Sequence, residues 1–289
     1  MDILHWFTDP LSYGFMVRGL LAAIMVGVIC PIIGAYMVLK GLSFFGDALS
    51  HAILPGVVIA FLLDLPLALG ALAAGLTAAF VIGLISQRGA VQEDTAIGIV
   101  FAGAFALGVA MLSTASNYAV DLTHILFGDV LGVSQGDLLF TLLVGGGILL
   151  MVFAFYKELL VYTFDPTLAI VLRLPATFLR YLLLTLIALT VIVSLQTVGI
   201  SLMLAMLVTP AAAAQLLTRR LPSMMAVGAA IGVSANVTGL YLSYYFNLAA
   251  GPTMVLVATV IFGLVFLLAP GRGVIARRVS SRRHLAARA

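Results

Sequence analysis

Long apolar runs recur along the whole chain, and they constrain its fold more than any other feature. The runs from Leu20 to Leu39 and from Val255 to Ala269 are apolar on every face of the helix that each would form. Hydrophobic residues make up 63% of the 289 residues and charged residues only 9%, against about 25% charged in an average soluble domain. A run of about 20 apolar residues matches the thickness of a bilayer. The sequence therefore predicts an integral membrane protein.

The spanning elements are predicted to be helices in one domain, residues 1–289. A β-barrel would show segments of about ten residues that alternate in hydrophobicity, which these runs do not. Breaks at Gly, Pro and charged residues divide the chain into nine spans. A single kinked helix through Gln196 to Gly199 would give eight instead of nine. The predicted spans are 15–39, 43–63, 66–86, 95–113, 138–156, 178–195, 198–217, 223–246 and 252–269.

The distribution of charge predicts the orientation, because cytoplasmic loops are enriched in Lys and Arg. Nine helices place thirteen of the fourteen basic residues on one side and only Arg18 on the other. Fusing 178–217 into one helix would separate Lys157 from Arg219, which favours nine. We therefore expect a cytoplasmic C-terminus and an extracytoplasmic N-terminus. The tail, 270–289, is basic and suited to anionic lipid. The thirteen are Lys40, Arg88, Lys157, Arg173, Arg180, Arg219, Arg220, Arg272, Arg277, Arg278, Arg282, Arg283 and Arg288.

Asp47 and His51 are ionisable residues within the second of these spans. Four residues is about one helical turn, so both side chains project from one face. Holding such a group at membrane depth costs roughly 2.5 to 3.5 kcal/mol, and it usually lines a cavity or an ion path. With the helix starting near Ser43, His51 lies about 12 Å in at 1.5 Å per residue. Pro55-Gly56 is expected to interrupt the same helix.

Three interpretations of this pair remain open from the residues alone. Imidazole together with carboxylate suits manganese, iron or zinc, and two ligands are too few for a tight structural site, so the pair suits a route for a transported metal ion. It could instead relay protons. It could also join two helices by hydrogen bonds to neighbouring groups. An intramembrane enzyme would need a third polar group converging on Asp47 and His51, and the sequence shows none.

Two loops are longer than a turn requires. The outer loop, 113–136, holds Asp121 and His124, which form a candidate shallow external site where an ion would first bind, or belong to a solvated loop. The inner loop, 157–177, contains Asp165 and Pro166 at the spacing of an N-cap and a first helical residue. We expect a short amphipathic helix there, which would be a docking element for a partner protein.

Several kinds of chemistry have no support in the sequence. Neither Lys40 nor Lys157 stands in the Gly-rich setting of a phosphate-binding loop, so any ATP hydrolysis must occur on a separate chain. Zinc-peptidase and nucleophilic-serine signatures are missing, which argues against an enzyme. The single cysteine, Cys30, excludes a disulfide framework and is expected to be a buried apolar side chain. The basic residues are scattered rather than grouped with aromatics, so no nucleic-acid partner is expected.

The segment Gly41 to Gly56, with its Asp-Ala-Leu-Ser-His element, resembles the signature of bacterial ABC-type permeases for manganese, zinc and iron, the ABC-3 metal permease family. The likeness continues in Thr163 to Ala169, in Gln196 to Ala214 and in Gly251-Pro252-Thr253. It covers nearly the whole chain. The resemblance implies a polytopic all-α protein like the permeases of type II ABC importers.

The resemblance also implies partners and residue roles. The partners are two cytoplasmic ATP-binding subunits, an extracytoplasmic metal-binding protein of cluster A-I, and a second permease copy as homodimer or heterodimer. Asp47 and His51 would contact the metal. Thr167 stands where the family often has Glu, which puts an acidic contact there in doubt. The ATPase-coupling residues would be Phe164, Asp165, Pro166, Leu168 and Ala169.

The function predicted from all of this is transport of a divalent transition metal by alternating access, as one subunit of an ATP-driven importer. The flanks of the pair, Gly46 and Pro55-Gly56, look closer to the manganese and iron branch than to the zinc branch. No permanently bound cofactor is expected. The alternative is a proton-coupled secondary carrier that uses the same pair and needs no ATPase.

Overall fold

Helices form all the regular secondary structure in the residues that this computed structural model describes, which are 8–87, 91–113, 130–269 and 273. Within these ranges, nine helical segments are long and apolar enough to cross a membrane. The predictions of an all-α fold and of many spanning helices are confirmed. The alternative of eight spans is wrong, because Gly199 separates one helix that ends at Val198 from another that begins at Ile200.

The spans follow the predicted order, with shifts of a few residues at their ends. The helix α8 begins at Gln135, three residues before the predicted start, because Ser134 and Asp137 form a reciprocal capping box. The inner loop holds two short helices, not one: α9 (Tyr156–Phe164) and α10 (Pro166–Val171). A short 3-10 helix, η1, spans Pro10–Ser12. The spanning elements are α2 (Gly14–Lys40), α3 (Phe45–Ala52) with α4 (Leu54–Leu62), α5 (Leu67–Gln87), α6 (Glu93–Leu112), α8 (Gln135–Ala154), α11 (Ala176–Val198), α12 (Ile200–Leu217), α13 (Leu221–Phe246) and α14 (Ala250–Leu268).

The second span is interrupted, but not at the predicted place. The break lies at Ile53, between α3 and α4, and Pro55 stands in the first turn of α4. Proline fits the first turn because it has no N–H to donate, whereas further along a helix its ring would meet the carbonyl four residues back. The discontinuity therefore falls before the proline, directly after Ala52.

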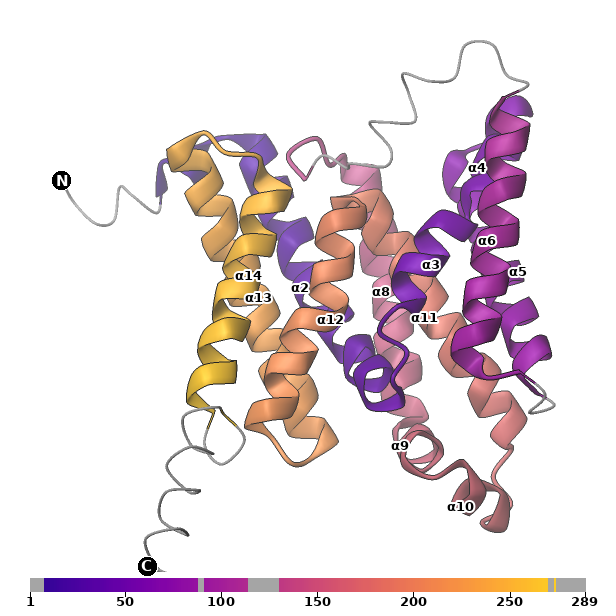
Figure 1. Cartoon of the computed structure of the whole chain (residues 1–289). Coiled ribbons are helices and arrows are strands. Elements are labelled where there is room, and N and C mark those ends of the chain that lie inside the picture. The colour runs from indigo at the N-terminus through magenta and orange to yellow at the C-terminus, as the bar shows by residue number, and fades with distance from the viewer. Residues whose placement is uncertain (1–7, 88–90, 114–129, 270–272, 274–289) are drawn as a thin grey trace, which may run out of the picture.

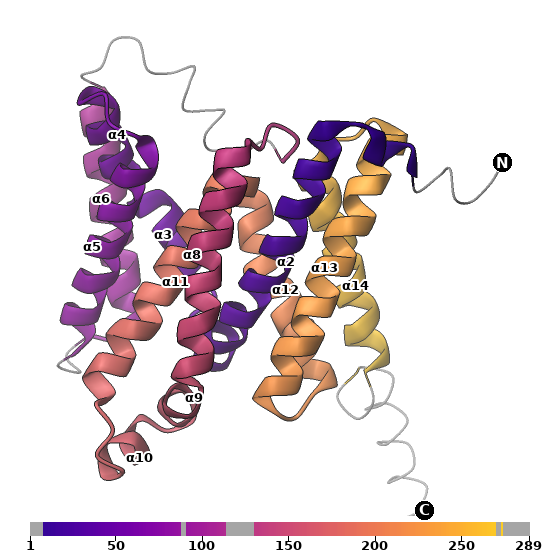
Figure 2. The same cartoon turned by 180° about the vertical axis from the view of Figure 1, so that it is seen from behind.

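The spans run between two faces of the molecule, as both cartoons show (Figure 1 and Figure 2). The short helices α9 and α10 lie at one of these, called here the α10 face. Following the chain, α2 begins at the opposite face and ends toward the α10 face, and α14 ends at the α10 face. Lys157 lies in α9, and Arg173 and Arg219 lie in connections at the α10 face, while Asp64 and Asp137 lie at the opposite face.

Small residues let the helix backbones approach closely. A side chain at Gly34 of α2 would collide with the backbone oxygen of Leu207 in α12. At Gly27, a Cβ atom would lie 3.0 Å from the backbone nitrogen of Val233 in α13. The helix α2 thus packs between α12 and α13. On the other side of the molecule, α4 packs on α5, and α11 packs on α5 and α8.

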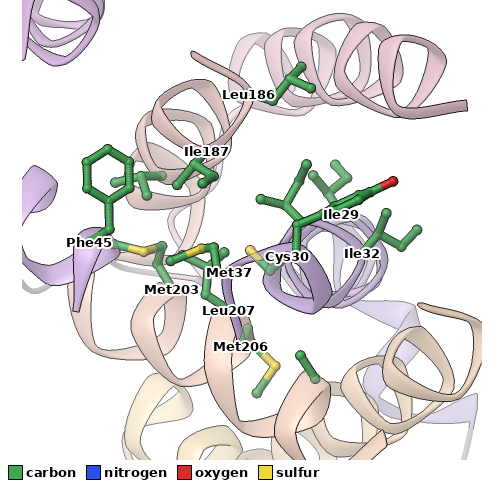
Figure 3. Close-up of a cluster of buried hydrophobic side chains, with 14 of the residues drawn as sticks. Ile29, Cys30, Ile32, Met37, Phe45, Leu186, Ile187, Met203, Met206 and Leu207 are labelled. Carbon is green, nitrogen blue, oxygen red and sulfur yellow. The ribbon is translucent and has the colours of Figure 1, made fainter. Parts of the chain in front are cut away.

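A buried apolar cluster fixes where α3 starts. The ring of Phe45, the first residue of α3, lies near the sulfur-containing side chains of Met37 and Met203 (Figure 3). These side chains are fully buried, as is Ile187 of α11. Gly41, with a φ of 74°, ends α2 in a left-handed conformation and reverses the chain. The next helix then begins against this core and carries Asp47 in its first turn.

Candidate functional site

The helix α3 presents Asp47 in its first turn and His51 in its last turn. The Nε2 atom of His51 lies 3.8 Å from Oδ1 of Asp47, and the two side chains are 34% and 48% exposed, respectively. That distance is too long for a hydrogen bond. Asp47 lies in the first turn of α3, where the positive end of the helix dipole favours a carboxylate. The pair is thus assembled on one helix face without being closed on itself.

Neither the side chain of Asp47 nor that of His51 forms a hydrogen bond with another residue in the described part of the chain. The nearest polar group, the hydroxyl of Ser50, donates to the backbone oxygen of Asp47 at 2.7 Å and leaves the carboxylate free. No group of three or more His, Cys, Asp or Glu side chains gathers among the described residues. The interpretation of the pair as a hydrogen-bonded joint between helices therefore finds no support.

Two aromatic rings of α6 hold the imidazole. The ring centroid of His51 is 5.7 Å from that of Phe101 and 5.6 Å from that of Phe105, the second in an edge-on arrangement at 76°. Contacts of this kind orient a ring through its carbon surface. The nitrogen atoms remain available to a ligand, because phenyl groups neither donate nor accept a conventional hydrogen bond.

His51 also lines a cavity of about 230 Å³ between α3, α4, α5, α6 and α11. Most of its lining is apolar, and Gln196 contributes an amide from the last turn of α11. A larger groove of about 810 Å³ lies between α4, α5 and α6, but Thr77 is the one polar side chain of its lining. The smaller cavity is therefore the one with chemistry suited to a cation.

The predicted capping of the inner helix is confirmed. The carboxylate of Asp165 accepts hydrogen bonds from the backbone N–H groups of Thr167 and Leu168, at 2.9 and 3.0 Å, and Pro166 is the first residue of α10. Ala169 is fully buried, so it packs α10 against the protein instead of adding to its outer surface. Large apolar side chains are exposed here: Phe164, Leu168, Ile170, Val171 and Leu172.

A polar cluster joins three spans near the α10 face. The guanidinium of Arg180, on α11, donates to Ser86 of α5 at 2.8 Å and to Glu93 of α6 at 3.2 Å. The ammonium of Lys40 lies 4.0 Å from the ring centroid of Tyr162. Burial, and secondly the negative charge of Glu93, raises the pKa of the Tyr162 hydroxyl to about 12. Tyr162 therefore stays neutral at physiological pH and offers Lys40 an uncharged aromatic face.

Some predicted residues lie outside this site, and some site residues escaped prediction. Asp121 and His124 are outside the described residues, and so is most of the basic tail. Phe101, Phe105 and Gln196 were missed, because nothing in their local sequence places them beside His51. Gln196 alone carried a signal, as a polar residue near the end of an apolar run.

The chain is similar to known proteins along nearly its whole length. A sequence model described as "ABC 3 transport family" matches residues 12–269. The manganese transport system membrane protein MntC of Halalkalibacterium halodurans is 45% identical over 276 residues, 96% of this chain and 94% of that protein. The chelated iron transport system membrane protein YfeD of Yersinia pestis is 43% identical over 255 residues, 88% of this chain and 86% of that protein. A chain in the structure of PsaBC from Streptococcus pneumoniae in complex with Fab superposes with a TM-score of 0.82 and 39% identity, over 94% of this chain and 98% of that one.

Proposed function

Because the chain belongs to the ABC 3 transport family, we propose that it is the membrane subunit through which an ATP-driven importer moves a divalent transition metal ion. The observation that carries this proposal is the open Asp47 and His51 pair, which stands directly before a break in a spanning helix. A carrier must bind its ion well enough to accept it and weakly enough to release it. Two available ligands on one helix face suit that requirement.

Manganese is the proposed cargo, with iron and zinc as further candidates. Relatives that are 40% or more identical over most of the chain are named for manganese transport, and one such relative is named for chelated iron. A carboxylate and an imidazole offer one hard and one intermediate ligand, which manganese and iron both accept. The ion would pass the pair by alternating access, with no metal bound permanently.

The energy source is proposed to be a pair of cytoplasmic ATP-binding subunits that dock on α10. Phe164 and Ile170 are 63% and 65% exposed, and α10 stands at the face where the basic connections lie. Exposed apolar side chains grouped at one surface suit a protein partner better than solvent. An extracytoplasmic metal-binding protein and a second copy of the permease complete the proposed assembly. The N-terminus would then be extracytoplasmic and the C-terminus cytoplasmic.

The test is uptake of labelled manganese by the reconstituted complex of permease and ATP-binding subunits. We expect D47A and H51A each to abolish uptake while the complex still assembles and hydrolyses ATP. The matched control is D94A, because Asp94 is an exposed carboxylate outside the pair. Wild-type uptake by both variants would remove the pair from the route.

The proton-coupled alternative makes a different prediction in the same assay. A secondary carrier would take up manganese from this chain alone, and dissipating the proton gradient would stop it. We expect no uptake without the ATP-binding subunits, and uptake that survives an uncoupler when they are present. Uptake by the isolated permease would overturn the ATP-driven proposal.

A further inference from the structure

We propose that Gln196 is a third side chain on the ion's route, whose amide oxygen helps to select manganese over softer metals. This inference rests on the proposed transport function, which it deepens by assigning a residue to metal selection. The described residues hold no third His, Cys, Asp or Glu near Asp47 and His51. Any further contact to the ion must come from an amide, a hydroxyl, a backbone carbonyl or water.

The cavity beside His51 supplies a candidate of this kind. Three of its lining residues have polar side chains: Ser50, His51 and Gln196. The hydroxyl of Ser50 is engaged with its own helix, since it donates to the backbone oxygen of Asp47. The cavity has a volume of about 230 Å³, several times the space of about 30 Å³ that one water molecule occupies in the liquid. The cavity that Gln196 and His51 both line is therefore large enough for a partly hydrated ion.

The amide of Gln196 is not occupied elsewhere. It is half-buried and makes no hydrogen bond to any residue that the structure describes. Leaving a polar group without a partner in an apolar setting is unfavourable, so the amide is suited to a ligand or water in the cavity. It also stands in the last turn of α11, just before the turn at Gly199. The carbonyl end of a helix carries partial negative charge, which favours a cation there.

The position of Gln196 gives the order in which the ion meets these groups. Leu67, the first residue of α5, and Leu112, the last residue of α6, line the cavity, and these two helix ends lie at the face opposite α10. Asp47 lies one turn before His51 in α3 and does not line the cavity. An ion that arrives from the face opposite α10 therefore reaches Gln196 and His51 first, and Asp47 afterwards.

The amide oxygen changes the character of the ligand set. Carboxylate and carbonyl oxygens suit manganese, whereas imidazole suits zinc and iron as well. With Gln196 the route offers the ion side-chain oxygens from two residues and a nitrogen from one, and without Gln196 it offers one residue of each kind. Gln196 should therefore matter more for manganese than for zinc.

Three substitutions separate this role from simple packing. In the reconstituted complex, Q196L removes the oxygen at similar size, and we expect the KM for manganese uptake to rise about tenfold or more, with a smaller change for zinc. Q196E restores an oxygen and should return manganese uptake to near the wild-type KM. Q196H replaces the oxygen with an imidazole nitrogen and should shift competition in favour of zinc.

The matched control is T190V. Thr190 lies in the same helix, its hydroxyl donates to the backbone oxygen of Leu186, and it does not line the cavity. This change also replaces a polar group with an apolar one and should leave the ratio of manganese to zinc uptake unchanged. If Q196L keeps the wild-type KM and ratio while D47A remains inactive, the role of Gln196 is wrong and the transport proposal stands. If wild-type protein takes up no manganese, the transport proposal itself fails.

Discussion

The imidazole of His51 is oriented by carbon surfaces, and this has a measurable consequence at the scale of single residues. Phe105 meets it edge-on at 5.6 Å between ring centroids. In F105L the imidazole of His51 loses this contact, so its nitrogen atoms point toward the ion for less of the time. Aromatic pairs of this kind contribute about 0.5 to 1.5 kcal/mol, so we expect a roughly two- to tenfold rise in the KM for manganese uptake. F153L, at an exposed phenylalanine of α8, is the control and should leave KM unchanged.

The close contact of Gly34 with Leu207 leads to a prediction about stability. A methyl group at Gly34 would meet the backbone oxygen of Leu207, which cannot turn aside as a flexible side chain can. We expect G34A to lower the free energy of unfolding by about 1 to 3 kcal/mol, visible as a lower melting temperature of the purified permease in detergent.

Gly147 provides the comparison for this variant. It also lies inside a spanning helix, α8, but a Cβ atom there would meet nothing within 4 Å. Alanine is a better helix former than glycine by about 1 kcal/mol, so G147A should be neutral or stabilising. Equal losses in G34A and G147A would mean that glycine is required for reasons other than close packing.

Local spacing made some of these residues predictable and left others hidden. Asp47 and His51 are one turn apart, and Asp165 directly precedes Pro166, so the sequence alone indicates a shared face and a cap. Phe105 and Gln196 reach the site only because α6 and α11 pack beside α3. Side chains brought together from distant segments leave no periodic signal in a single sequence.

At the scale of elements, the sequence indicated the number of spans and a break within the second span, but not the position of that break. Gly199 adopts φ 81° and ψ 172°, which glycine tolerates, and this explains why α11 and α12 separate there. Pro55 suggested a break at its own position, whereas the helix stops earlier, at Ile53. The element α9 was missed, because Lys157 and Glu158 gave that stretch the polarity of a loop.

The Asp165 cap of α10 permits a test of whether α10 couples transport to ATP hydrolysis. D165A removes both the cap and the charge, and should fray α10 at a cost of about 1 kcal/mol. D165N keeps a side chain that can accept from the N–H groups of Thr167 and Leu168. We expect manganese transport per ATP hydrolysed to fall in D165A and to be largely retained in D165N.

Asp137 serves as the control for that experiment. Its carboxylate accepts a hydrogen bond from the backbone N–H of Ser134, the N-cap residue of α8, so D137A removes a first-turn carboxylate and half of a capping box at the face opposite α10, away from the proposed ATPase contact. Its coupling ratio should match that of the wild type. A coupling loss in D165N as large as in D165A would assign the effect to charge, and no loss in either would place docking elsewhere.

At the scale of the whole molecule, the proposed orientation can be read with single cysteines. Cys30 is buried, so a membrane-impermeant maleimide should leave the natural protein unlabelled in intact cells. In a C30A background, D64C lies in the exposed turn between α4 and α5, and R219C lies in the exposed turn between α12 and α13. We expect D64C to react in intact cells and R219C to react only after permeabilisation. The reverse pattern would invert the topology.

The meeting of α4 and α5 at Gly56 and Gly70 restricts how this chain can evolve. A Cβ atom on either glycine would strike the backbone oxygen of the other. No second mutation at the partner position makes room, because the nearest obstacle at each position is main chain, and the Cβ atom of Ala74 or Ala60 lies 2.6 Å from the added atom. A lineage that keeps this helix pair must therefore inherit both glycines together.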